Sequence, residues 1–240
     1  LNPFLGMRAI RFCLSRPDIF RSQLRAILRA SAFGKVRIMF PMISALEELE
    51  QAMDHLEEAK KELDERQLPY NPHLDVGIMI EVPSAALIAD TLAPRVDFFS
   101  VGTNDLIQYA MAVDRANPDI AYLYQPCHPS ILRLLRSVLQ AAWEHGKWVS
   151  ICGEMAGEAV LAPLVLGLGI HELSMSPVAI GPVKRLIRSI RLHEAERLVQ
   201  DAMRCGTAEA VWQLCVAFVR NVAPDVLSPA NQDNDDKDSP

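Results

Sequence analysis

Polar side chains that can do chemistry stand where three short apolar segments of the chain end. One segment ends in Glu81, the next runs into Asn104 and Asp105, and a third ends in Cys152 and Gly153. Catalytic groups in a barrel of parallel strands gather at the carboxyl ends of those strands. Two carboxylates, an amide and a thiol on one rim could bind a metal ion, orient an anion and move a proton.

The carboxylates and two arginines indicate a site for a metal ion and an anion. Glu81 and Asp105, from separate strand ends, suit Mg²⁺, which takes one or two carboxylates and completes its shell with water and substrate oxygens. Arg115 follows Asp105 across a short predicted helix, and Arg8 lies in a loop beside Gly6. The planar fork of an arginine matches phosphate and carboxylate groups.

Each of these residue types also has an ordinary structural role. A single arginine near a helix end usually forms a surface ion pair, and a single cysteine at a strand end is usually a buried core residue. A glutamate at a strand end, followed closely by proline, faces either solvent or a site. From spacing alone, both roles stay open for Arg8, Arg115, Cys152 and Glu81.

Alternating strand and helix patterns must position these side chains. The predicted strands are nearly all apolar, which is typical of strands covered on both sides in parallel α/β sheets. They span residues 36–40, 76–81, 97–102, 149–152 and 172–175. Helices are predicted from Pro17 to just before Gly34, after a capping box of Ser44 and Glu47, from Pro83 to Pro94, over 106–113, from Pro129 to His145, over 182–191, over 192–204 and around 211–218.

The repeated units favour one fold over another. Five strand–helix units indicate either a barrel or an open doubly wound sheet. No G-x-G-x-x-G or Walker pattern follows a predicted strand, which argues against a nucleotide-binding sheet. We therefore predict an α/β fold, a (β/α)₈ TIM-type barrel that lacks its first strands, over residues 1–222. Residues 223–240 are rich in Asn, Asp, Ser and Pro and predict a disordered acidic tail.

Composition excludes several classes of protein. The 240 residues carry a formal charge of −6 and no basic stripe, which argues against a nucleic-acid partner. No apolar run reaches the roughly 20 residues that a membrane span needs, and the first residues do not resemble a secretory signal. The five cysteines form no C-x-x-C pair, so we expect reduced thiols in a cytoplasmic protein. The chain opens in what reads as a running loop, so we expect an N-terminal portion to be missing.

Four stretches of the chain resemble, in order and spacing, the signature segments of phosphoenolpyruvate-utilising enzymes. They are Asn2-Pro-Phe-Leu-Gly-Met-Arg8-Ala-Ile-Arg11, Gly77-Ile-Met-Ile-Glu81-Val-Pro83, Asp97-Phe-Phe-Ser-Val-Gly-Thr-Asn-Asp-Leu-Ile-Gln-Tyr-Ala-Met-Ala-Val-Asp-Arg115 and Ile151-Cys152-Gly-Glu-Met-Ala-Gly157. Within that superfamily, the stretches ending in Arg115 and Gly157 are similar to the Enzyme I family of the bacterial sugar phosphotransferase system, or to its nitrogen-related paralogues.

The resemblance implies a role for each candidate residue. Glu81 and Asp105 correspond to the Mg²⁺ ligands of the family. Asn104, Arg115, the phosphate-binding Arg8 and the backbone at Gly153 correspond to contacts with phosphoenolpyruvate. Cys152 corresponds to the acid that protonates C3 of the enolate as pyruvate forms. A thiol with an unperturbed pKa of about 8.5 can donate a proton to carbon near neutral pH.

The resemblance also implies partners that this chain does not contain. The family transfers the phosphoryl group to a histidine on a separate swivelling domain, passes it to the carrier protein HPr, and dimerises through the phosphoenolpyruvate-binding domain. Neither that histidine segment nor two further arginines of the family are found in the sequence. Two alternatives stay open: a degenerate or isolated domain that binds phosphoenolpyruvate or dimerises without catalysis, and a barrel like that of pyruvate phosphate dikinase.

Overall fold

The computed structural model describes residues 3–227, which form two compact units. The first unit comprises the residues up to Gly102 together with Gln140–Val149, and the second comprises Thr103–Leu139 together with the residues from Ser150 onward. None of the described helices is long and apolar enough to cross a membrane.

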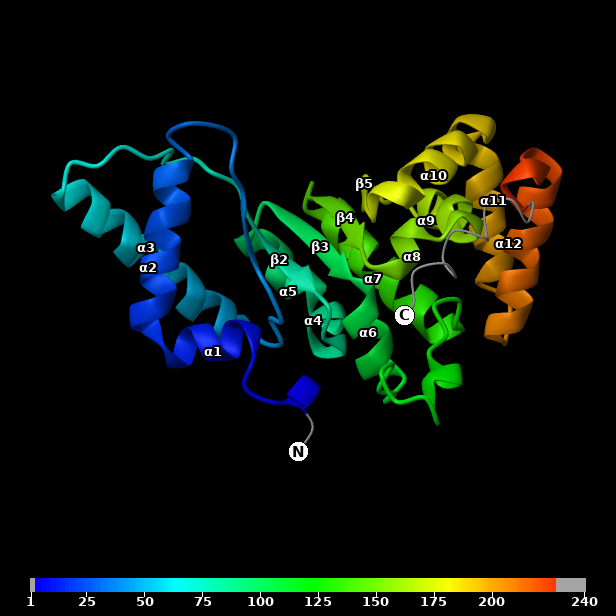
Figure 1. Ribbon diagram of the computed structural model, residues 1–240, viewed down its shortest axis with the longest axis horizontal. Helices are drawn as coiled ribbons and strands as arrows, with labels where there is room; N and C mark the ends of the chain where they lie inside the picture. The colour runs from blue at the N-terminus through cyan, green and yellow to red at the C-terminus, as the bar shows by residue number, and fades with distance from the viewer. Residues whose placement is uncertain (1–2, 228–240) are drawn as a thin grey trace, which may run out of the picture. The chain divides into compact units, whose positions relative to one another are not determined.

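The described residues contain five strands (Figure 1). Within each of the two units, the strands pair in parallel. They are β1 (Ile38–Phe40), β2 (Val76–Ile80), β3 (Phe98–Gly102), β4 (Trp148–Cys152) and β5 (Glu172–Ser174). In the first unit β1 pairs with β2 and β2 with β3, in chain order, and Ile78 and Phe99 lie opposite each other. Parallel neighbours in chain order, joined by helices, are the arrangement of a (β/α) barrel.

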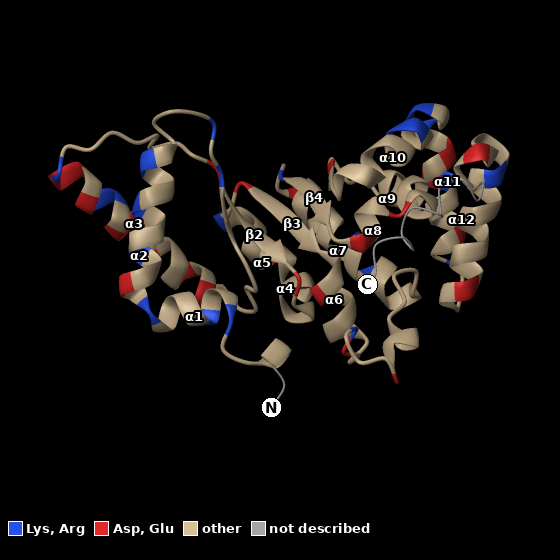
Figure 2. Cartoon of the chain, in the orientation of Figure 1, with Lys and Arg blue, Asp and Glu red and all other residues tan. Residues whose placement is uncertain are grey.

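The helices of the first unit pack largely through apolar side chains. They are η1 (Pro3–Leu5), α1 (Ala9–Ser15), α2 (Pro17–Ala30), α3 (Leu46–Glu65), α4 (Pro83–Leu87), α5 (Ala89–Leu92) and η2 (Ala93–Arg95). Helix α2 buries Phe20, Leu24 and Leu28, and the ring of Phe20 lies edge-on to Phe40 of β1 at 6.0 Å. The outer surfaces of α2 and α3 carry alternating charges (Figure 2), and Arg25 pairs with Glu62 at 2.6 Å.

An aromatic stack stabilises the sheet of the first unit. The rings of Phe98 and Trp148 lie parallel with centroids 4.5 Å apart, and the guanidinium of Arg37 lies 4.8 Å from the Trp148 ring. A Cβ at Gly77 would lie 2.5 Å from the Phe98 ring, so β2 requires glycine there. Cation–π and stacking contacts of this kind oppose a shift of one strand along its neighbour, which hydrogen bonds alone would not prevent.

The second unit pairs β4 with β5, with Cys152 opposite Ser174, and covers them with helices. These are α6 (Thr103–Ala110), η3 (Ala121–Leu123), α7 (Pro129–Glu144, whose last residues belong to the first unit), α8 (Glu154–Gly157), η4 (Ala159–Leu161), α9 (Ala162–Gly167), α10 (Pro177–Ser189), α11 (Leu192–Ala202), α12 (Ala208–Val222) and η5 (Pro224–Leu227). A core of Ala162, Val183, Leu186 and Val219 joins α9, α10 and α12.

The α/β class and the parallel strands confirm the predicted fold class, and each of the five predicted strands is present within about two residues of its expected place. Several details differ. The predicted helix from Pro83 to Pro94 is divided into α4, α5 and η2, and α1, α8 and α9 were not predicted. Helix α6 begins at Thr103, so Asn104 and Asp105 lie in its first turn, upstream of the predicted start at residue 106. Helix α10 begins at Pro177 and contains Pro182. The predicted tail, residues 223–240, lies outside the described residues except for its start, which includes η5.

The predicted capping box of Ser44 and Glu47 before α3 was wrong, because Ala45 is the N-cap residue and no side chain caps the helix. Ser44 donates from both its backbone N–H and its hydroxyl to Oε2 of Glu48, each at 2.7 Å. Glu47 is exposed and lies one position earlier in the first turn. The helix begins at Leu46, two residues after Ser44. The carboxylate that accepts from Ser44 is therefore that of Glu48, four positions along the chain.

Candidate functional site

The start of α6 is tied to the end of β4 in the second unit. Thr103 is fully buried, and its hydroxyl donates to the backbone carbonyl of Cys152 at 2.7 Å. A buried hydroxyl with a good acceptor contributes on the order of 1 kcal/mol and, more importantly, fixes geometry. The strand end that carries the predicted acid therefore lies directly beside the predicted substrate-binding turn.

Asn104 is held by two donors from separate segments. Its Oδ1 accepts from the backbone N–H of Glu154 at 3.0 Å and from the hydroxyl of Tyr124 at 3.2 Å. Gly153 makes this approach possible, because its φ is +102° and a Cβ there would lie 2.6 Å from Oδ1 of Asn104. The structure therefore brings the predicted residues Asn104, Cys152 and Gly153 together.

Asp105 and Arg115 also lie near one another. Asp105 is 6% exposed, and its Oδ1 lies 4.0 Å from Nη2 of Arg115. The backbone N–H of Arg115 donates to Oε1 of the buried Gln108 at 3.2 Å. The turn between them passes through Ala112, whose φ of +53° is in the left-handed region that costs a non-glycine residue energy. The fold thus brings Arg115 back to the first turn of α6.

Tyr124 contacts this cluster and was not predicted. Burial is the main cause that raises the pKa of Tyr124 to about 12, and the carboxylate of Glu154 acts in the same direction. The charge of the nearby Arg115 guanidinium lowers this pKa, and the hydroxyl of Tyr124 donates to Asn104. No periodic pattern marks Tyr124, since it lies in a loop after η3 and its partner Asn104 is 20 residues away.

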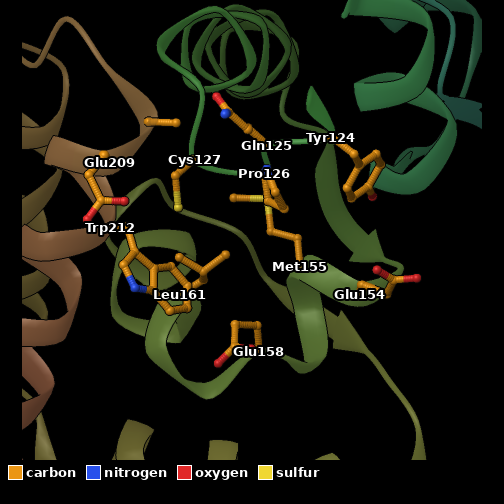
Figure 3. Close-up of a pocket in the computed structure, with 11 residues that line it drawn as sticks. Tyr124, Gln125, Pro126, Cys127, Glu154, Met155, Glu158, Leu161, Glu209 and Trp212 are labelled. Atoms are coloured by element: carbon orange, nitrogen blue, oxygen red, sulfur yellow. The ribbon is translucent and has the colours of Figure 1, made fainter. Parts of the chain in front are cut away.

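A hollow of about 890 Å³ opens beside this cluster within the second unit. Asn104, Cys152, Gly153 and Glu154 line it together with residues of β5, α10 and η5. A second cavity of about 330 Å³ shares Glu154 and is also lined by Tyr124. In Figure 3, Tyr124 and Glu154 lie at one side of this second cavity, and Glu209 and Trp212 of α12 lie at the other.

Glu81 belongs to the first unit and is also nearly buried, at 6% exposure. Its Oε1 accepts from the backbone N–H of Met42 at 2.7 Å, and Met42 has a φ of +53°. A Cβ at Gly102 would lie 2.9 Å from Oε2 of Glu81, so the carboxylate packs against the strand end. Strained backbone is often found at functional sites, and Met42 was missed because the sequence carries no sign of its dihedral angle.

Arg8 lies directly before α1 in the first unit. Its backbone is extended, and its guanidinium lies 5.8 Å from the Phe4 ring. The next residue, Ala9, has a φ of +50°. Four non-glycine residues in the described part of the chain have a positive φ: Ala9, Met42, Gln67 and Ala112. All but Gln67 lie next to or near a candidate site residue, namely Arg8, Glu81 or Arg115.

Carboxylate oxygens suit a hard cation such as Mg²⁺, which keeps water or substrate oxygens in the rest of its shell. Among the described residues, no group of three or more His, Cys, Asp or Glu side chains is placed to hold a metal ion. That excludes an all-protein cage within the described residues but not a Mg²⁺ ion, which binds through one or two carboxylates and substrate oxygens. Glu81 in the first unit and Asp105 in the second are each a nearly buried carboxylate, the ligand type that such an ion takes.

Comparison with known families gives a match over most of the chain. Residues 1–192 match the family model described as the phosphoenolpyruvate-binding domain of phosphoenolpyruvate-utilising enzymes. This agrees with the resemblance carried by the four sequence stretches.

Curated relatives cover nearly the whole chain. It is 50% identical over 221 residues to a phosphoenolpyruvate-protein phosphotransferase of Staphylococcus carnosus, which covers 92% of this chain and 39% of the relative. It is also 50% identical over 220 residues to the protein of that name in Bacillus subtilis, covering 92% of this chain and 38% of the relative. The chain thus spans less than half the length of these relatives.

A solved structure shares the fold. The crystal structure of a citrate lyase from Burkholderia xenovorans superposes with a TM-score of 0.51 over 88% of this chain and 71% of that one. At 18% sequence identity, this likeness supports the α/β fold and nothing about the reaction.

Proposed function

Because the chain belongs to the family of phosphoenolpyruvate-binding domains of phosphoenolpyruvate-utilising enzymes, we propose that it binds phosphoenolpyruvate and carries the half-reaction that releases pyruvate. The observation that carries this proposal is the cluster in the second unit. There Asn104 and Cys152, an amide donor and a thiol, line one hollow of about 890 Å³, and Arg115 lies 4.0 Å from Asp105, the residue after Asn104.

The name shared by the relatives supports a protein as the phosphoryl acceptor. We place that acceptor on a histidine of a separate domain, because the chain covers only 39% of the relative from Staphylococcus carnosus. From there the phosphoryl group would pass to an HPr-type carrier and serve sugar uptake. We expect the reaction in the cytoplasm, where a thiol such as Cys152 stays reduced, and a homodimer as the working form.

The side chains divide the chemistry between binding and proton transfer. Asn104, Arg115, Arg8 and the backbone at Gly153 hold the carboxylate and phosphate, since phosphoryl transfer depends chiefly on positioning and charge stabilisation. As the bond between phosphorus and the enol oxygen breaks, the phosphoryl group goes to the imidazole nitrogen. The enolate left behind takes a proton at C3 from the thiol of Cys152 and becomes pyruvate. The thiolate then regains a proton from water.

Mg²⁺ would be held by the carboxylates of Glu81 and Asp105, with further oxygens from the substrate. A bound Mg²⁺ supplies positive charge to the phosphoryl and enolate oxygens. The protein keeps both carboxylates ready: Glu81 accepts from the N–H of Met42, and Asp105 lies 4.0 Å from the guanidinium of Arg115. These contacts fix the position of each carboxylate.

Calorimetric titration with phosphoenolpyruvate, with and without Mg²⁺, tests this function. We expect binding that requires Mg²⁺ and is lost in Glu81→Gln and Asp105→Asn. Asp119→Asn, which changes an exposed carboxylate of the second unit, is the matched control and should bind like the parent. Equal binding in every variant would refute the metal assignment. Absence of binding by the parent up to millimolar concentrations would refute the function.

A further inference from the structure

The hydroxyl of Tyr124 contacts a side chain that the proposed function assigns to substrate binding. It donates to Oδ1 of Asn104 at 3.2 Å, and the nearby charge of Arg115 lowers its pKa. Tyr124 is half-buried, whereas its neighbour Tyr122 in η3 is 72% exposed. A loop residue 20 positions along the chain therefore contacts the first turn of α6.

The direction of the hydrogen bond between Tyr124 and Asn104 follows from the protonation of the phenol. Because burial raises the pKa of Tyr124 to about 12, the phenol keeps its proton throughout the neutral range. Its O–H therefore donates, and Oδ1 of Asn104 accepts.

The same bonds fix which end of the Asn104 carboxamide faces a ligand. Its Oδ1 accepts from Tyr124 and from the backbone N–H of Glu154, so both lone pairs are used. Rotating the amide by half a turn would place its NH₂ group against the backbone N–H of Glu154, which can only donate. The NH₂ group is therefore the end left to donate, and Asn104 lines the hollow beside Cys152.

We propose that Tyr124 is a positioning residue that holds the carboxamide of Asn104 in the orientation that receives an anionic substrate. This inference rests on the proposed function for the identity of that substrate. It does not require Tyr124 to touch the reacting atoms. The backbone N–H of Glu154 is its partner in orienting Asn104, and Gly153 lets that N–H approach.

Tyr124→Phe tests the proposal, because it removes one oxygen and keeps the ring. We expect the affinity for phosphoenolpyruvate with Mg²⁺ to fall by about tenfold, as for a buried polar group that loses its partner. Tyr122→Phe, in the same loop, is the matched control and should bind like the parent. The two variants should show the same melting temperature as the parent.

A double-mutant cycle with Asn104→Ala separates positioning from a general loss of structure. If Tyr124 acts through Asn104, Tyr124→Phe should weaken binding less in the Asn104→Ala background than in the parent. Equal losses in both backgrounds would overturn the proposal. An unchanged affinity of the single variant Tyr124→Phe would also overturn it.

The side-chain amide resonances of Asn104, followed by ¹⁵N NMR without any ligand, keep this inference distinct from the proposed function. We expect Tyr124→Phe to shift or broaden these resonances as the carboxamide gains freedom to rotate. Unchanged resonances would overturn the positioning role. If the parent does not bind phosphoenolpyruvate but the resonances respond as expected, the proposed function fails while the positioning role of Tyr124 is supported.

Discussion

At the scale of single residues, the site depends on a close approach that only glycine allows. Gly153 has a φ of +102° and lies against Asn104 and Thr103, where an added Cβ would be 2.6 Å and 2.7 Å from their side-chain oxygens. Gly169 has a similar φ of +94°, but a Cβ added there would meet nothing within 4 Å. Comparing alanine at the two positions therefore separates the cost of backbone strain from the cost of a steric clash.

Gly153→Ala should damage both stability and binding. Backbone strain alone should cost about 1–2 kcal/mol in either variant, and the clash at Gly153 should displace Asn104 in addition. We expect Gly169→Ala to lose stability but keep its affinity for phosphoenolpyruvate. Chemical denaturation and calorimetric titration of both variants measure these effects. Equal affinity in the two variants would contradict the role given to Gly153.

Cys152→Ala should slow the proton transfer without weakening binding. A positioned acid contributes about 10²–10⁴-fold to a rate, so solvent deuterium should enter the methyl group of pyruvate slower by that factor. Cys205→Ala removes a thiol that follows α11 in the chain and serves as the control. The exchange is followed by NMR with Mg²⁺ present. An unchanged rate would make Cys152 an ordinary core cysteine.

The sequence predicted the site residues that follow strands, and missed those that reach the site from loops. Asn104, Cys152 and Gly153 could be placed because parallel strands bring their carboxyl ends together. Tyr124 and Met42 could not, because nothing local in the chain specifies a contact 20 or 39 residues away. A strained backbone such as that of Met42 is a product of tertiary packing, which propensity and periodicity do not encode.

At the scale of elements, the strands were easier to predict than the helix ends. The strands are short apolar runs bounded by polar residues, so their limits are sharp. Helix α10 shows the opposite case: the sequence predicts a helix that starts at Pro182, yet the helix begins five positions earlier at Pro177. Proline at the first position is common, and here that rule applies to Pro177, while Pro182 is tolerated inside the helix.

The entry to α3 allows a direct test of the contact between Ser44 and Glu48. Glu48→Ala should lower the free energy of unfolding by about 0.5–1.5 kcal/mol, because it removes the acceptor of the two hydrogen bonds from Ser44. Glu47→Ala removes an exposed acid from the same helical turn and should change this free energy by no more than about 0.5 kcal/mol. Urea denaturation of both variants measures the difference. A larger loss for Glu47→Ala than for Glu48→Ala would contradict the role given to Glu48.

At the scale of the whole molecule, buried acids that stay protonated make the second unit sensitive to alkali. Burial raises the pKa of Cys127 and of Cys215 to about 12. The unfolded thiols ionise near pH ~8.5. Between these limits the unfolded chain releases protons that the folded chain keeps. The free energy of unfolding therefore has its full value below about pH 8.5 and falls as pH rises toward 12.

The expected slope is about 1.4 kcal/mol per thiol for each pH unit within that window. Cys215→Ala should lower stability at neutral pH by leaving a cavity, and should also make the decline at alkaline pH less steep. Cys205→Ala should leave the slope unchanged. Thermal denaturation from neutral to alkaline pH measures both effects, and a parent with a flat profile would contradict the predicted ionisation.

This chain alone should not become phosphorylated by phosphoenolpyruvate. The Nδ1 atoms of His128 and His145 contact Ser130 and the carbonyl of Ala141, and His55 lies 3.3 Å from Glu58. Transfer needs reacting atoms about 3–3.5 Å apart in line, and we assign the acceptor to another domain. Incubation with radiolabelled phosphoenolpyruvate and Mg²⁺ should label an added histidine domain and not this chain. Acid-labile phosphate on any of its histidines would contradict the assignment.

The stack of Phe98, Trp148 and Arg37 has a spectroscopic consequence. Trp148 is sandwiched between a ring and a guanidinium in the first unit, Trp143 is 81% exposed on α7, and Trp212 lines a cavity of the second unit. Three indoles in three polarities emit at different wavelengths and differ in access to a soluble quencher. The protein therefore carries its own optical labels, and its emission during denaturation would report whether the two units melt together or in turn.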